Sequence, residues 1–178
     1  MAISVRDMVY TALFAAVICA VAPFAVQIGP VPLSFATLVI YIAAGTLEWK
    51  LGTLSALLYV ALGAIGLPVF SNFEGGFHKI AGFTGGFITG YILCALGTGV
   101  IITVFRRRIW SYAVGMAVGT VLLYTCGTIW YILQSGTALG ASLAICVLPF
   151  LPGDAVKIVV ACVAAPKLRR AISHSARS

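Results

Sequence analysis

Long apolar runs, each about as long as a membrane-spanning helix, constrain the fold of this chain more than any other feature. Only 8% of its 178 residues are charged, whereas a soluble domain has roughly 25%. A bilayer core about 30 Å thick needs about 20 apolar residues per helix, so the chain has room for five or six spans and for no soluble enzymatic domain. We predict an all-α membrane protein with six transmembrane helices in a single transmembrane domain, residues 1–178, with spans at about 7–28, 33–47, 51–67, 81–105, 110–133 and 139–166.

The distribution of Lys and Arg predicts the orientation of these spans. With the N-terminus inside, nine of the eleven basic residues fall on the inner side, and only Lys79 and Lys157 fall toward the outer side. This bias follows the positive-inside rule, so we predict a multi-pass protein of the cell membrane with both termini cytoplasmic. We interpret the run Arg106–Arg108 as a topology anchor, with a specific lipid or nucleotide site as the alternative. We predict no nucleic-acid partner, because the basic residues lie between apolar runs.

A proline-rich break interrupts the last apolar run. The segment Pro149–Gly153 prevents residues 138–166 from forming one straight helix, and a break at membrane depth must be shielded by protein or line a cavity. Asp154 and Lys157 follow it, three residues apart and therefore on one face of the restarted helix. Inserting a lone charge at that depth of the membrane costs at least roughly 2.5 to 3.5 kcal/mol of free energy. The pair must therefore neutralise itself, meet a ligand, or do both; an inert ion pair that stabilises the kink is the alternative.

The segment from Leu67 to Lys79 is a second candidate element. It combines aromatic residues, an amide, a glycine pair and charges, which is more chemistry than a plain connector requires. We interpret it as a cap over an outward-facing cavity, with an interfacial aromatic belt as the alternative. Tyr91 and Trp130 are candidates for aromatic walls with a polar edge, with an interface anchor as the alternative for both and the better match for Trp130.

Small residues recur at helical spacing in three of the predicted spans. Ala12, Ala16 and Ala20 are four residues apart and form a strip of low bulk on one helix face. Such strips let membrane helices approach closely. For the alanine strip, internal packing and docking against another membrane subunit stay open. Internal packing is the prediction for the glycine strips, which are Gly82, Gly86 and Gly90, and Gly115 and Gly119.

Four sequence blocks resemble the signature blocks of the BioY family of biotin transporters. They are Gly66–Phe70 followed by Gly75 and Gly76, Gly82–Phe87 with Gly90, Gly127–Trp130, and Pro149–Asp154 with Lys157. The sequence departs from the family pattern at Ala36 and Phe83. The resemblance implies the S component of an energy-coupling-factor (ECF) transporter, a six-helix bundle that associates with a transmembrane coupling protein and two cytoplasmic ATPases. It also implies that the alanine strip meets the coupling protein.

The resemblance further implies biotin as the transported substrate, without a cofactor. Biotin has a ureido ring with two N–H donors and one carbonyl, an apolar thioether ring, and a carboxylate. We expect Asp154 and Asn72 at the ureido ring and Lys157 or loop N–H groups at the carboxylate, with both charges acting at one end as the alternative. The predicted substrate-binding residues are Asp154, Lys157, Asn72, Phe70, Gly75, Gly76 and Tyr91.

Other classes of function find less support in the sequence. An intramembrane enzyme is disfavoured because the motifs His-Glu-x-x-His and Gly-x-Ser-x-Gly are absent and the only histidines are His78 and His174. The sequence has no phosphate-loop motif, so we expect ATP hydrolysis in the partner subunits. The five cysteines lack zinc-ligand spacing, so we predict no metal site. A different vitamin remains the alternative substrate, because a carboxylate, an amine and an amide suit several small solutes.

Overall fold

The structure, a computed structural model, describes residues 4–27 and 31–174. Its elements are α1 (Val5–Val21), β1 (Ala25–Gln27), β2 (Pro32–Ser34), α2 (Ala36–Thr46), α3 (Trp49–Ala64), the 3-10 turn η1 (Ser71–Phe73), α4 (Phe77–Ala81), α5 (Gly85–Val104), α6 (Ile109–Ser135), α7 (Leu139–Cys146) and α8 (Leu151–His174). The mostly helical fold is confirmed. The expectation of an all-α protein is corrected by the antiparallel hairpin of β1 and β2, whose strands are too short and too apolar to distinguish from helix ends in the sequence.

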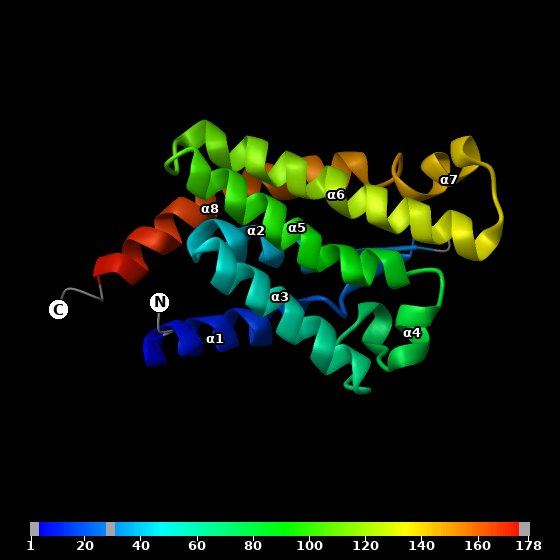
Figure 1. The fold of residues 1–178 in the computed structure, drawn as a ribbon, viewed down its shortest axis with the longest axis horizontal. Helices are drawn as coiled ribbons and strands as arrows, with labels where there is room; N and C mark the ends of the chain where they lie inside the picture. Colours follow the sequence, from blue (N-terminus) through cyan, green and yellow to red (C-terminus); the bar gives the residue numbers. More distant parts are fainter. Residues whose placement is uncertain (1–3, 28–30, 175–178) are drawn as a thin grey trace.

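The helices run along one elongated bundle (Figure 1). α5 and α6 form an antiparallel pair, and α2 packs against α3, α5 and α8. Nine of the eleven residues of α2 are buried, so this helix is the centre of the fold. The start of α1, the end of α8 and the α5–α6 turn lie at one end, here called the terminal end. The hairpin, α4 and the α6–α7 turn lie at the opposite end, here called the loop end.

Glycines bring α5 and α6 into close contact. A Cβ atom on Gly86 would lie 2.3 Å from the Cβ of Trp130, and one on Gly127 would lie 2.4 Å from the ring of Phe87. Both distances are shorter than van der Waals contact, so a larger residue at either position would force the helices apart. A Cβ on Gly119 would likewise lie 2.3 Å from a side chain of α5. The predicted packing role is therefore confirmed for Gly86 and Gly119.

The helix lengths agree best with the predicted spans in α5 and α6. Within the described residues, these two are long and apolar enough to cross a membrane, and α7 with α8, bent by 48° at their junction, makes a third if the pair is one span. The predicted break is thereby confirmed. α2 and α3 are shorter apolar helices of 11 and 16 residues. By length and composition, this part of the chain holds two or three spans, fewer than the six predicted.

Two predicted boundaries are wrong. The first span ends at Val21 and not at residue 28, because Pro23 cannot continue the helix and the chain enters the hairpin. The segment from Leu67 to Lys79 contains η1 and the start of α4, in agreement with the expectation that it is more than a plain connector. The last helix continues past Pro166 to His174, because polar residues extend it beyond the apolar span.

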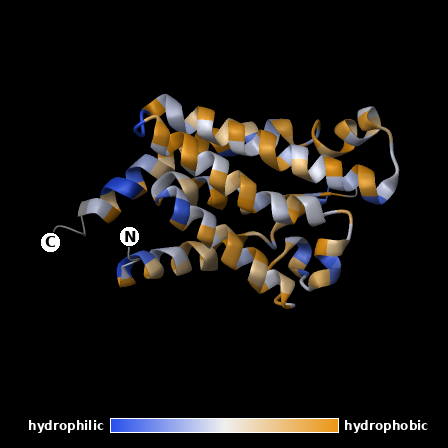
Figure 2. Cartoon of the chain, in the orientation of Figure 1, coloured by the Kyte–Doolittle hydropathy of each residue, from blue (hydrophilic) through white to orange (hydrophobic). Residues whose placement is uncertain are grey.

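Apolar and polar residues are separated along the bundle. Figure 2 shows apolar residues over most of its length, and hydrophilic residues gathered at the terminal end and around α4. Large apolar side chains such as Val121, Ile129 and Val159 are exposed on the outer faces of α6 and α8. A water-soluble protein rarely exposes so much contiguous apolar surface, so these faces are suited to contact with lipid.

Candidate functional site

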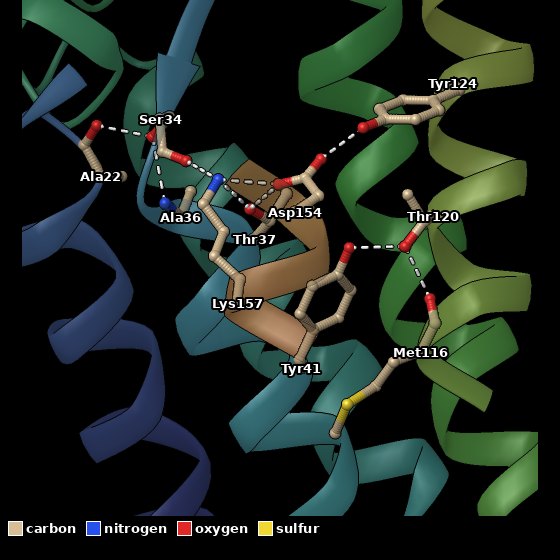
Figure 3. Close-up of polar contacts among 10 residues, drawn as sticks. All are labelled: Ala22, Ser34, Ala36, Thr37, Tyr41, Met116, Thr120, Tyr124, Asp154 and Lys157. Atoms are coloured by element: carbon tan, nitrogen blue, oxygen red, sulfur yellow. Dashed lines mark hydrogen bonds and ion pairs between the residues drawn. The ribbon is translucent and has the colours of Figure 1, made fainter. Parts of the chain in front are cut away.

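Asp154 and Lys157 form a buried ion pair near the start of α8 (Figure 3). Lys157 Nζ lies 2.8 Å from Asp154 Oδ1, and the two residues are 6% and 4% exposed. α8 restarts at Leu151 with Pro152 in its first turn, a position that suits proline, and this start places both charges on one face. The predicted shared face is confirmed, and the two charges neutralise each other, which was one of the predicted outcomes; contact with a ligand stays a prediction.

Three residues from other segments complete the hydrogen bonding of this pair. Lys157 donates to the Ser34 carbonyl oxygen at 2.7 Å and to Thr37 Oγ1 at 2.9 Å. The Tyr124 hydroxyl donates to Asp154 Oδ2 at 2.6 Å, and the Thr37 hydroxyl lies 3.4 Å from Asp154 Oδ1. A buried ion pair is tolerated only when its remaining donors and acceptors are satisfied. These contacts meet that condition.

Ser34 is itself held in place by the start of α2. Its hydroxyl donates to the Ala22 carbonyl at 2.9 Å and accepts the Ala36 N–H at 3.0 Å, as a residue at a helix start commonly does. Further along α2, the Tyr41 hydroxyl lies 2.7 Å from Thr120 Oγ1 on α6. These bonds fix α2 against its neighbours (Figure 3), so the polar groups around the ion pair are preorganised.

A cavity of about 250 Å³ lies at the loop end. Its lining residues are Gln27, Val31, Pro32, Tyr59, Phe70, Ser71, Asn72, Glu74, Lys79, Thr84, Phe87, Ile88 and Tyr91. A smaller cavity of about 30 Å³ lies against Asp154, Lys157 and Tyr124, and Phe87 and Tyr91 belong to the linings of both. The shared lining makes the two cavities neighbouring parts of one site. Its walls combine aromatic and aliphatic side chains with several polar groups, and polar groups that converge on a concave site are typical of small-molecule binding.

The segment from Leu67 to Lys79 forms one wall of the larger cavity. Phe70 packs edge-on against the ring of Tyr59, with the centroids 5.7 Å apart. Asn72 has a left-handed backbone with φ of 64°, and its amide donates to Gln27 Oε1 at 2.9 Å. That hydrogen bond joins the segment to β1, and this placement supports the predicted cap.

Five of the predicted binding residues line the two cavities. Tyr91 lines both, Phe70 and Asn72 line the larger, and Asp154 and Lys157 line the smaller. Tyr91 on α5 and Asp154 on α8 are 63 residues apart in the chain (154 − 91) and are brought to one site because α5 and α8 both pack against α2.

Gly75, Gly76 and Trp130 are not among the residues that line these cavities. Gly76 has φ of 97°, and its N–H donates to the Gly63 carbonyl at 2.7 Å. A Cβ on Gly75 would lie 2.1 Å from the carbonyl oxygen of Leu67. The two glycines therefore shape the segment that carries Phe70 and Asn72. Trp130 Nε1 donates to a backbone carbonyl just before α5 at 2.9 Å and anchors the start of that helix.

The amino-acid sequence matches the BioY family over residues 1–174. The chain belongs to the BioY family. The biotin transporter BioY of Thermotoga maritima is 33% identical over 168 residues, which cover 93% of this chain and 96% of that relative. The biotin transporter BioY of Rhodobacter capsulatus is 35% identical over 170 residues, which cover 87% and 88%. The predicted family is confirmed.

A solved structure of the S-component for biotin from an ECF-type ABC transporter has the same fold. Its TM-score to this chain is 0.87 at 28% sequence identity, and the match covers 93% of this chain and 92% of that one. The S-component fold predicted for this BioY-family chain is confirmed. Family and fold together place the chain among membrane transport proteins that bind a solute, and not among enzymes.

Analysis of the sequence missed Thr37, Tyr124 and Ser34 as partners of the ion pair. A signal was present for Tyr124, because a tyrosine hydroxyl inside an apolar span needs a hydrogen-bond partner. Asp154 is the one carboxylate deep in a predicted span. Ser34 contributes a backbone carbonyl, for which side-chain chemistry gives no signal.

Replacing Tyr124 with phenylalanine should destabilise the fold through the loss of one hydrogen bond to a buried carboxylate. Bonds to charged groups contribute about 1.5 to 3 kcal/mol, and Asp154 Oδ2 would lose its partner. We expect the free energy of unfolding, measured by chemical denaturation in mixed micelles, to fall by about that amount.

Tyr131→Phe is the matched control, because Tyr131 lies on the same helix and is also buried. Its ring packs against Phe83, and its hydroxyl makes no hydrogen bond within the described residues. This variant should stay within about 0.5 kcal/mol of the wild type. Equal losses in both variants would show that the bond to Asp154 contributes nothing specific.

Proposed function

We propose that this chain is the substrate-binding subunit of an ECF-type vitamin importer and captures biotin in the loop-end cavity. One observation carries the proposal: a buried, hydrogen-bonded Asp154–Lys157 pair lies beside a cavity of about 250 Å³ whose walls combine aromatic rings with polar side chains. BioY-family relatives of this chain are biotin transporters. The chain supplies the binding step, and its partners supply the energy.

The two ends of the site suit the two ends of biotin. Asp154 can accept ureido N–H groups, and Lys157 and Thr37 can donate to the ureido carbonyl. Tyr91 lies between the two cavities and offers its ring to the apolar thioether ring. Asn72 and Lys79 line the larger cavity, where Asn72 donates to Gln27 and Lys79 pairs with Glu74. We propose that both donate to the biotin carboxylate instead when it binds, which moves Asn72 from its expected place at the ureido ring. The 2.8 Å contact between Asp154 and Lys157 supports the alternative in which both charges act at the same end of the ligand.

We place this chain in the cell membrane as one domain, residues 1–178, with six spans and both termini in the cytoplasm. The S-component fold supports six spans, with α1 to α3 shorter than a full crossing, and α7 and α8 forming one bent span. The gathering of hydrophilic residues at the terminal end supports an inner position for that end (Figure 2). The loop-end cavity then opens toward the outside.

The partners in this proposal are the lipid bilayer, a transmembrane coupling protein and two cytoplasmic ATPases. Ala12, Ala16 and Ala20 are all exposed on α1, whereas Thr11, Phe14 and Ala15 on the same helix are buried. The buried side accounts for internal packing, so the alanine strip is free for a partner helix. Small residues allow the close approach that membrane helices need.

Enlarging the alanine strip should uncouple transport from binding. We expect Ala16→Leu to keep wild-type biotin affinity, because Ala16 is exposed on α1 away from the cavity linings. Uptake of biotin by vesicles that contain all subunits should fall at least about tenfold, because the added bulk opposes close helix approach. Ala117→Leu, at an exposed alanine on α6, should leave both quantities unchanged. Equal uptake by the two variants would argue against the alanine strip as the docking face.

Radiolabelled biotin binding to detergent-purified protein tests the function itself. Biotin should bind tightly, unlabelled biotin should displace it, and thiamine and riboflavin in large excess should not. Desthiobiotin keeps the ureido ring and carboxylate and should compete. Displacement by thiamine or riboflavin would assign the site to another vitamin, and no binding by folded protein would remove biotin from the proposal.

A further inference from the structure

Arg107 and Arg169 converge on the last turn of α2 at the terminal end. Arg107 Nη1 donates to the Leu47 carbonyl at 3.5 Å, and Arg169 Nη1 donates to the Thr46 carbonyl at 3.1 Å. One arginine comes from the α5–α6 turn and the other from the polar extension of α8. Both side chains are half-buried. Arg107 also has a left-handed backbone with φ of 56°, which is uncommon for residues other than glycine.

The two arginine charges therefore lie near each other, with few negative groups to offset them. Neither arginine forms an ion pair with a carboxylate within the described residues. Glu48 acts on Arg107 only through space and is exposed. Burial, and next the charge of Arg169, lower the pKa of the Arg107 guanidinium. Holding two like charges out of water is unfavourable unless an anion joins them.

The surroundings of the two arginines match a lipid better than a free anion. A guanidinium has five N–H donors, and Arg107 uses only part of these on Leu47 and Tyr112, so donors remain for a ligand. Val104, Ile109 and Leu168 flank the arginines in the sequence and are 65%, 86% and 41% exposed. A phosphate held by two guanidinium forks would leave acyl chains beside these apolar side chains.

We propose that Arg107 and Arg169 bind the phosphate group of an anionic phospholipid at the terminal end of the bundle. The lipid bridges the α5–α6 turn and α8 and neutralises the two charges. This site is separate from the biotin cavity, whose lining contains neither arginine. A variant that loses lipid binding but keeps biotin binding therefore tests the lipid site without testing the biotin site.

Binding of a fluorescent phosphatidylglycerol to the full-length protein in neutral phosphatidylcholine nanodiscs tests this site. A hydrogen bond to a charged group contributes about tenfold or more in affinity, whereas an exposed basic residue attracts anionic lipid only through its screened charge. Arg107→Gln with Arg169→Gln removes the hydrogen bonds of both guanidinium groups to the phosphate and should weaken binding at least about thirtyfold. The matched control replaces Arg106 and Arg170 with glutamine, and both are exposed neighbours in the same two segments. It removes the same charge and should weaken binding less than about threefold.

Three further measurements test folding, general attraction to anionic membranes, and binding of free phosphate. Both double variants should keep wild-type biotin binding, which also reports that they are folded. If the first one does not fold, Arg169→Lys replaces it; this variant keeps the charge, loses the fork and should weaken binding measurably. Equal weakening in the two double variants would mean only general attraction to anionic membranes and would overturn the site. Displacement of the lipid by millimolar inorganic phosphate would overturn the assignment to a lipid.

Discussion

Biotin affinity is expected to fall about thirtyfold or more when Asp154 is replaced by asparagine or Lys157 by alanine. Each change leaves one charged partner buried without the other, at 4% or 6% exposure. Losing one member of a buried, hydrogen-bonded charge pair costs about 2 to 5 kcal/mol of binding. Equilibrium binding of radiolabelled biotin to the purified variants measures this loss. Wild-type affinity in both variants would show that the ion pair lies outside the biotin site.

Removing both charges together shows whether the Asp154–Lys157 pair contacts biotin or only stabilises the fold. Asp154→Leu with Lys157→Met leaves no unpaired charge, and such replacements of buried pairs are often neutral or stabilising. The double variant should therefore unfold at or above the wild-type denaturant concentration, yet bind no biotin. Recovery of biotin binding in this variant would mean that the pair only stabilises the bend between α7 and α8.

Gly75→Ala is expected to weaken biotin binding by about tenfold to a hundredfold without touching either cavity. The new Cβ would lie 2.1 Å from the carbonyl oxygen of Leu67, which is backbone and cannot rotate away. Strain of this kind costs about 1 to 3 kcal/mol, and each 1.4 kcal/mol is a factor of ten. The segment would relieve it by moving, and Phe70 and Asn72 would move with it. Titration calorimetry with biotin measures the effect.

Gly140→Ala is the matched control for this substitution. A Cβ on Gly140 meets nothing within 4 Å, and the residue lies in the first turn of α7, where alanine is the better helix former. This variant should keep full biotin affinity and unfold no earlier than the wild type. If Gly75→Ala kept the affinity of this control, the shape of the segment would not govern the cavity.

Residue periodicity and length were sufficient to predict the helices that are apolar throughout. α5 and α6 were predicted to within four residues at each end because their apolar runs end at charged or glycine-rich turns. The first span was drawn too long because the residues of the hairpin are apolar as well. Hydropathy does not distinguish a short strand pair from a helix end; only the hydrogen bonds between β1 and β2 do.

The candidate site was predictable where its chemistry is unusual for a membrane span. Asp154 and Lys157 stand out because charges are costly there, and the proline break before them indicated a restarted helix. Thr37 does not stand out, since threonine is common in membrane helices, and for Tyr124 the sequence indicates only the need for a hydrogen-bond partner and not which one. Their role depends on α2 and α6 meeting α8, which is a property of the tertiary structure. Gly75 and Gly76 stay predicted binding residues, and their contacts indicate that they shape the segment that carries Phe70 and Asn72.

Asp154 and Lys157 lie one turn apart on α8, so their ion pair forms as soon as this one helix forms. α8 is the last helix of the described chain to leave the ribosome, and during its insertion the two charges enter the bilayer as a dipole. Two separate charges would each cost at least roughly 2.5 to 3.5 kcal/mol at the membrane centre. If the two charged residues lay on different helices, the charge on the earlier helix would be unpaired in the bilayer until the later helix was synthesised. We therefore expect the contacts with Thr37 and Tyr124 to form in a later step, in which the inserted helix docks onto its neighbours.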